Sequence, residues 1–172
     1  AAFTYWLLAF PMAGPLQIAD RVSHPLELFL VPHILTLFGF AFFFPRKHLE
    51  RFTFVGGILA AVATLTYWLF PFLSAAALVF AGVGGAALVV RCGALLGQAG
   101  KPVEAAGWSL VAANLMLIGV ISLPLGCAGK FLLTVIIVLS PLPVRLPPQE
   151  RGDLRPLWNY LPFVLLYQVV AG

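Results

Sequence analysis

The chain has 172 residues, 62% hydrophobic and 9% charged, with a mean hydropathy of +1.02. This composition leaves too little polar surface to coat a water-soluble globule, so it excludes a soluble domain and predicts a protein embedded in a lipid bilayer. The net charge of +4 does not indicate nucleic acid, because the basic residues fall at predicted membrane boundaries, where anionic headgroups supply the counter-charge.

Apolar segments divide the chain at intervals close to the roughly 20 residues that a helix needs to cross a hydrocarbon core. The predicted spans are residues 3–19, 25–45, 52–70, 72–96, 105–123 and 129–144. The fourth could stop at Val90, with Arg91 extending toward the headgroups, and the sixth is short unless it starts near Leu125. The sequence therefore predicts an all-α, polytopic transmembrane bundle over residues 1–144.

The first predicted span is interrupted by Pro11, Gly14 and Pro15. Proline removes a backbone donor and loosens a helix, and the freed groups must be satisfied by neighbouring helices or by water in a cavity. Gln17 adds a polar side chain to the same segment. These residues are either tolerated irregularities of a membrane helix or part of the wall of a cavity.

Basic residues fall in alternate connections between the spans. Arg21 and Lys130 lie in one set of connections, and the other set holds Arg46, Lys47, Arg51, Arg91, Lys101, Arg145, Arg151 and Arg155. Because Lys and Arg resist translocation, this distribution predicts that the larger set is cytoplasmic. We therefore expect a multi-pass protein of the plasma (inner) membrane with a cytoplasmic N-terminus.

The fourth span is rich in small residues, which let helices approach closely in lipid. They are Ala75, Ala76, Ala77, Ala81, Gly82, Gly84, Gly85, Ala86 and Ala87, followed by Gly93 and Gly97. This span is predicted to be central. We expect substitution of Gly85 or Gly93 by leucine to separate packed helices.

Few polar residues are predicted at membrane depth. Asn114, near the middle of the fifth span, is either an interhelical hydrogen-bond clasp or a ligand contact. His33 is predicted to be a packing histidine, and Lys130 to extend toward the outer headgroups. Cys92 and Cys127 are placed near opposite faces of the bilayer and are predicted to be packing residues.

Residues 145–156 are rich in proline and arginine and are predicted to be a cytoplasmic linker. Residues 157–172 read as the start of a seventh transmembrane helix. A helix ending at mid-bilayer leaves backbone groups unpaired, so we expect the remaining half of a longer chain, or other membrane subunits, as partners.

The topology resembles the amino-terminal half of a major facilitator superfamily transporter. Residues 3–8 (FTYWLL) leading to 14–16 (GPL) look like its first helix, and residues 91–97 (RCGALLG) look like the inner end of its fourth. Residues 44–51 (FPRKHLER) keep the basic charge of its second connection but lack the aspartate. The resemblance implies a transporter in which a small solute passes between two rocking halves.

That resemblance makes Pro11, Gly14, Pro15, Gln17 and Asn114 the predicted substrate-binding residues. No glycine-rich phosphate loop, paired cysteines, haem-clamping histidines or embedded serine with a base is evident, so no enzyme activity, cofactor or metal is predicted. A non-transporting sensor module and an accessory subunit of a larger membrane complex are the alternative functions.

Overall fold

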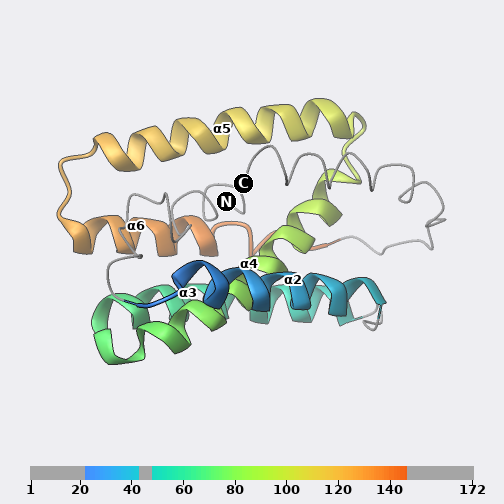
Figure 1. The fold of residues 1–172 in the computed structure, drawn as a ribbon. Coiled ribbons are helices and arrows are strands. Elements are labelled where there is room, and N and C mark those ends of the chain that lie inside the picture. Colours follow the sequence, from blue (N-terminus) through green and yellow to red (C-terminus); the bar gives the residue numbers. More distant parts are fainter. Residues whose placement is uncertain (1–21, 43–47, 147–172) are drawn as a thin grey trace.

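The computed structural model describes residues 22–42 and 48–146 (Figure 1). Of these described residues 83% are helical and none lies in a strand, which confirms the all-α prediction. The elements are α2 (Pro25–Phe42), α3 (Leu49–Leu69), the 3₁₀ turn η3 (Pro71–Leu73), α4 (Ser74–Leu96), α5 (Pro102–Ser122) and α6 (Cys127–Leu139).

Three of the helices are long and apolar enough to cross a membrane: α3, η3 continued by α4, and α5. Helices α2 and α6 are shorter apolar helices. The predicted first span, 3–19, and the predicted seventh, 157–172, lie outside the described residues, as does most of the predicted linker. The described part of the chain is thus that of a membrane protein with three helices of spanning length, not six.

Prolines set several helix ends. Pro71 and Pro102 stand in the first turn of their helices, where the missing N–H has no intrahelical partner to lose. The sixth span was predicted to run to residue 144, but α6 ends at Leu139. The prediction was wrong because Pro141 and Pro143 carry no N–H to continue the helix.

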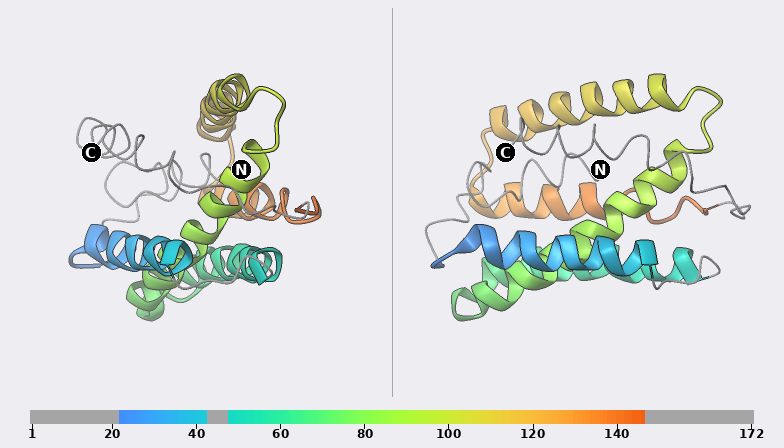
Figure 2. Two further views of the ribbon diagram at one scale, coloured as in Figure 1. Left: turned by 90° about the vertical axis from the view of Figure 1, so that its right-hand side faces the viewer. Right: turned by 45° about the vertical axis from the view of Figure 1, so that its right-hand side comes forward.

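Successive helices run in alternating directions, and α4 crosses α2 and α3 obliquely (Figures 1 and 2). Helix α4 packs extensively against both α2 and α3, and α6 packs on α3. Helix α5 lies apart and touches α4 and α6 at few points. Helices α2, α3, α4 and α6 therefore form the packed part of the described chain.

Glycines on α4 bring its backbone against two neighbours. A Cβ on Gly84 would lie 2.6 Å from the backbone nitrogen of Ala60 and 2.7 Å from the carbonyl oxygen of Gly56, both on α3. A Cβ on Gly82 would overlap the carbonyl oxygen of Phe29 on α2. The predicted central position of this helix is confirmed, because side chains at these positions would force the helices apart.

Gly93 does not take part in that packing. A Cβ there would have no described atom within 4 Å, apart from its own helix backbone, so the expectation that leucine at Gly93 separates packed helices was wrong. Gly93 lies on the last turns of α4, which extend beyond the crossing with α2 and α3.

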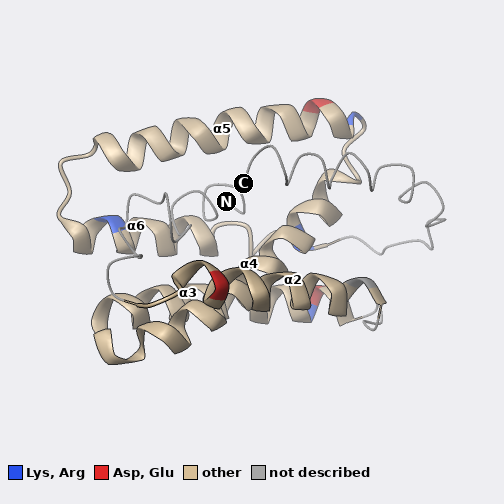
Figure 3. Ribbon diagram, viewed as in Figure 1, with Lys and Arg blue, Asp and Glu red and all other residues tan. Residues whose placement is uncertain are grey.

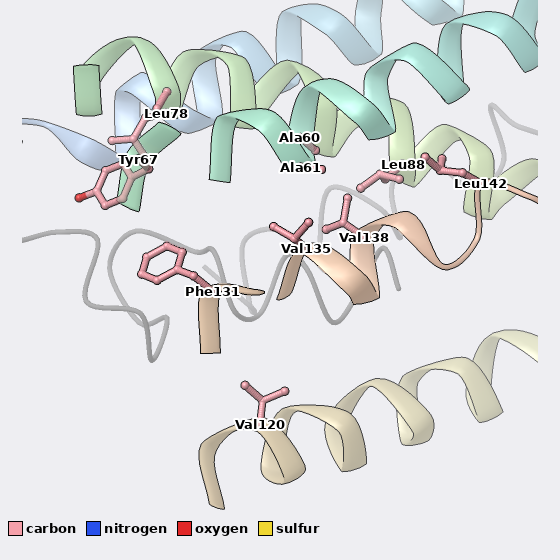
Figure 4. Packing of buried hydrophobic residues seen from close by; sticks show 11 residues of the cluster. Ala60, Ala61, Tyr67, Leu78, Leu88, Val120, Phe131, Val135, Val138 and Leu142 are labelled. Carbon is pink, nitrogen blue, oxygen red and sulfur yellow. The ribbon is translucent and has the colours of Figure 1, made fainter. Parts of the chain in front are cut away.

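The main apolar core lies between α3, α4 and α6 (Figure 4). Tyr67 and Leu78 lie toward Phe131 of α6, whose ring stacks on Trp68 with centroids 6.2 Å apart. Val135 and Val138 of α6 lie beside Ala60, Ala61 and Leu88. Helix α5 contributes Val120, which lies near its C-terminal end. This core fixes α6 against α3.

Charged residues gather at the helix ends (Figure 3). Most of the described Lys and Arg residues lie toward the end of the bundle where α3 begins and α4 finishes: Arg51, Arg91, Lys101 and Arg145. Lys130 lies at the opposite end. The described helices thus place most of their basic residues at one end of the bundle, as expected for alternate connections.

Candidate functional site

The most unusual side chain of the described structure is Arg91. It lies in the last third of α4 and is 1% exposed, although it is charged and stands in an apolar bundle. From the sequence, Arg91 was predicted to lie in a cytoplasmic connection or to extend toward the headgroups. That expectation was wrong, because the side chain turns inward and finds acceptors inside the bundle.

All three guanidinium nitrogens of Arg91 donate hydrogen bonds. Nη1 donates to Thr53 Oγ1 of α3 at 3.0 Å, and Nε donates to the carbonyl oxygen of Pro141 at 3.3 Å. Nη2 donates to the carbonyl oxygens of Leu142, at 3.0 Å, and Val144. We call these residues the Arg91 clamp. It joins α3, α4 and the turn after α6.

The sequence around α6 explains why the acceptors are available. Helix α6 ends at Leu139, and in the turn that follows the prolines at 141 and 143 supply no N–H, so few backbone donors are available to the carbonyls of this turn. The planar guanidinium carries five N–H groups in a fixed fork, so it can satisfy several carbonyls at once. Thr53, fully buried, accepts from Arg91 and donates to the carbonyl oxygen of Glu50 at 3.2 Å.

No carboxylate within the described ranges forms a close ion pair with Arg91, although Glu50 of α3 lies near enough to favour its charge. The contacts of carboxylates with basic side chains found there are the hydrogen bond of His24 with Glu27 at 3.3 Å and the ion pair of Lys101 with Glu104 at 2.9 Å, and both are exposed and local in the chain. Charge-assisted hydrogen bonds to the carbonyl oxygens and to the Thr53 hydroxyl also stabilise the guanidinium. With every nitrogen already donating, the clamp fits a structural role better than ligand binding.

A second buried polar contact joins α2 to α4. His33 is buried, its Nδ1 donates to the carbonyl oxygen of Gly82 at 3.1 Å, and its ring stacks on Phe29 with centroids 5.7 Å apart. A carbonyl can only accept, so the proton of the neutral ring is on Nδ1. This geometry is that of the packing histidine predicted from the sequence.

The predicted substrate-binding residues are not brought together within the described structure. Asn114 is exposed on α5, where its Nδ2 donates to the carbonyl oxygen of Leu110 in the same helix at 2.9 Å. No described residue of another helix hydrogen-bonds to it. Pro11, Gly14, Pro15 and Gln17 lie outside the described residues.

Lys130 lies near the start of α6, and its Nζ donates to the carbonyl oxygen of Ile121 at 3.5 Å. Cys92 and Cys127, on α4 and α6, are both unpaired. Over residues 22–42 and 48–146 no group of three or more His, Cys, Asp or Glu side chains is placed to hold a metal ion.

Comparison with known proteins found no matching family model, no matching curated protein and no matching solved structure. The Arg91 clamp is the feature that sequence reasoning missed. Its signal was the run Pro141-Leu142-Pro143 after an apolar helix, since that run leaves carbonyls that need an outside donor.

Proposed function

We propose that this chain is part of an integral membrane protein that moves a small solute by alternating access. The observation that carries the proposal is the unequal packing of the helices. Helices α2, α3 and α4 are joined by backbone-close contacts, whereas α5, also of membrane length, touches the other described helices at few points. Alternating access needs such a division, because one group of helices must move against another around a site.

The topology belongs to the same proposal. Six spans over residues 1–144, a cytoplasmic linker at 145–156 and the start of a seventh helix at 157–172 form one half of a facilitator-type transporter in the inner membrane. The gathering of basic residues at one end of the described helices supports this orientation.

Asn114 is the proposed ligand contact on α5, and Gln17 and the loosened segment from Pro11 through Gly14 to Pro15 complete the proposed site. The role of Asn114 as a ligand contact is supported by its hydrogen bonding. Its one hydrogen bond to a described residue is to its own helix, so it does not join α5 to another described helix. An apolar cavity needs only a few convergent polar groups to orient a small ligand.

The test is solute-driven swelling of proteoliposomes that contain the full chain. Vesicles shrunk in glycerol, glucose or alanine reswell as the solute enters, and stopped-flow light scattering follows the rate. We expect at least one solute to enter faster than into protein-free vesicles, and Asn114→Ala to slow that entry. Reswelling equal to the protein-free rate for all three contradicts transport of such neutral solutes.

The accessory-subunit alternative is favoured by a different observation, the large exposed apolar surface of α5. Only 11% of the most apolar stretch of this helix is buried, against 44% for α3 and 56% for α4 with η3. A subunit that contributes helices to a larger complex predicts no solute-dependent swelling and co-purification with other membrane proteins.

A further inference from the structure

The turn that follows α6 is attached to the described helices by two anchors. We call residues 141–145 the strap. Leu142 is 7% exposed, whereas residues 143–145 are all exposed. The backbone N–H groups of Leu142 and Val144 donate to carbonyl oxygens at the end of α6 and within the strap itself. The attachment of the strap to α3 and α4 therefore depends mainly on the Leu142 side chain and on Arg91.

The apolar anchor is Leu142, which lies in a space that α3 leaves open. A Cβ built on Gly57 of α3 would lie 2.5 Å from Leu142 Cδ2, so a side chain at position 57 would crowd the leucine. Leu142 belongs to the apolar core that also holds Ala60 and Leu88 (Figure 4). It is the one buried residue of the strap.

The polar anchor is Arg91, and Glu50 of α3 offers it a second acceptor. Glu50 and Thr53 are three residues apart, so they project within about 60° of each other on α3. Thr53 accepts from Arg91 and donates to the backbone carbonyl of Glu50. The Glu50 side chain is exposed and lies near enough to Arg91 to favour its charge. Because a carboxylate can accept two parallel hydrogen bonds from a guanidinium, Glu50 can replace the strap carbonyls as its partner.

We propose that the strap exchanges between the docked position seen here and a released position in which Arg91 pairs with Glu50. Segments with few buried apolar side chains are those that open locally while the rest of a protein stays folded. Release leaves the guanidinium with a partner, and the strap carbonyls move toward the charged end of the bundle, where water can bond to them.

The exchange would control how the chain leaves the bundle. The strap comes directly before the linker predicted at 145–156, so its docking decides whether the start of that linker is attached to α3 and α4. The proposal is independent of transport.

Thiol accessibility tests the release of the strap. In the full chain with Cys92→Ala and Cys127→Ala, a cysteine replaces Leu142, and a water-soluble maleimide is present on both sides of phosphatidylcholine vesicles. Val138→Cys, fully buried on α6, reports opening of the bundle itself. Arg91→Ala should raise the labelling rate of Leu142→Cys roughly tenfold or more, because several hydrogen bonds to a charged donor are lost, and leave Val138→Cys slow. Equal rises at both positions, or none at 142, overturn a separately opening strap.

Glu50→Gln tests the exchange of partners. It removes the carboxylate that receives Arg91 on release, so Leu142→Cys should be labelled roughly 2- to 5-fold more slowly, the range for one partly exposed ion pair. Glu104→Gln is the matched control, since Glu104 is also exposed but pairs with Lys101 on α5, and it should leave the rate unchanged. A rate for Glu50→Gln equal to or above that of the parent overturns the proposal, because a strap without the exchange does not depend on this carboxylate.

A disulfide tests the docked position. A Cβ at 57 would lie 3.3 Å from Leu142 Cγ, which brings the Cβ atoms of Gly57→Cys and Leu142→Cys close to the range of a disulfide. Copper phenanthroline should cross-link this pair in the same background and leave the pair of Gly93→Cys with Leu142→Cys open, since a Cβ at 93 has no described atom within 4 Å outside its own helix backbone. No cross-link between 57 and 142 overturns the docked position.

Discussion

Arg91 shows how one charged side chain can be held in an apolar bundle by hydrogen bonds to carbonyl and hydroxyl oxygens. Its donors meet the carbonyls of the turn after α6 and the Thr53 hydroxyl, so the cost of removing a guanidinium from water is offset by charge-assisted hydrogen bonds. The arrangement makes the turn after α6 depend on a residue of α4, although the two lie about 50 positions apart in the chain.

Removing Arg91 should therefore destabilise the bundle. We expect Arg91→Ala to lower the free energy of unfolding by roughly 2–3 kcal/mol, because three carbonyls of the turn after α6 and the buried Thr53 hydroxyl lose a charged donor at once. Arg91→Lys should recover only part of the loss, since an ammonium does not reproduce the planar fork. Thermal unfolding in detergent measures both variants, with Arg51→Ala, an exposed arginine on α3, as the control. A melting temperature for Arg91→Ala equal to that of Arg51→Ala would show that the clamp contributes nothing.

Asn114 gives the opposite expectation for stability. Its hydrogen bond goes to Leu110 of its own helix and none reaches another described helix, so Asn114→Ala should change the free energy of unfolding by no more than about 0.5 kcal/mol. Melting temperature and solute entry, measured on the same preparation, separate the roles. A clear fall in melting temperature with unchanged solute entry would mean that Asn114 is a structural clasp.

At the scale of the elements, the contacts of α4 depend on which glycine of the helix is considered. Gly82 and Gly84 lie where α4 crosses α2 and α3, and their missing side chains set the distance between the helices. Gly93, nine residues beyond Gly84, lies past the crossing and has open space around it. The same residue type on the same helix thus has different structural roles.

This difference supplies a matched pair of variants. Gly84→Ala should destabilise the bundle by roughly 1–3 kcal/mol, because its Cβ meets the backbone of α3, which cannot move aside as a flexible side chain can. Gly93→Ala should be neutral or stabilise by up to about 1 kcal/mol, since alanine is the better helix former. Unfolding of both in one detergent measures the contrast, and equal melting temperatures would contradict the close crossing.

At the scale of the whole molecule, the alternating helix directions define two ends with different charge. The connection between α4 and α5 belongs to the basic end, and the connection between α5 and α6 belongs to the other. Because basic ends stay in the cytoplasm, the two connections should be reached by reagents from opposite sides of the membrane.

Gly100 and Gly126 report on these two connections. Both are exposed, and at either position a Cβ would meet no described atom within 4 Å beyond the local backbone, so cysteine there should not disturb the fold. In a background with Cys92→Ala and Cys127→Ala, an impermeant maleimide added to intact cells should label Gly126→Cys and leave Gly100→Cys unlabelled until the membrane is permeabilised. Labelling of both in intact cells would refute the proposed orientation.

The sequence by itself determined the properties that depend on composition and on the length of the apolar segments. The length of the apolar segments and the positions of the prolines predicted an all-α membrane protein, and most of the helices start close to the predicted positions. The reason is that backbone N–H and C=O groups in lipid must be hydrogen-bonded within the protein, which an apolar segment achieves by forming a helix. Small residues on the fourth span also predicted its central place, which Gly82 and Gly84 confirm.

Only the tertiary structure decided which side each residue of a helix faces. From the sequence, Arg91 was predicted to be a boundary residue and Gly93 a packing residue. In the structure Arg91 is buried and Gly93 has open space around it, because burial depends on where a helix crosses its neighbours and not on residue type. The Arg91 clamp needed the turn at Pro141 to come beside the end of α4. The turn comes close to α4 because α6 packs on α3. This packing joins side chains that are far apart in the chain, so no local sequence pattern predicts it.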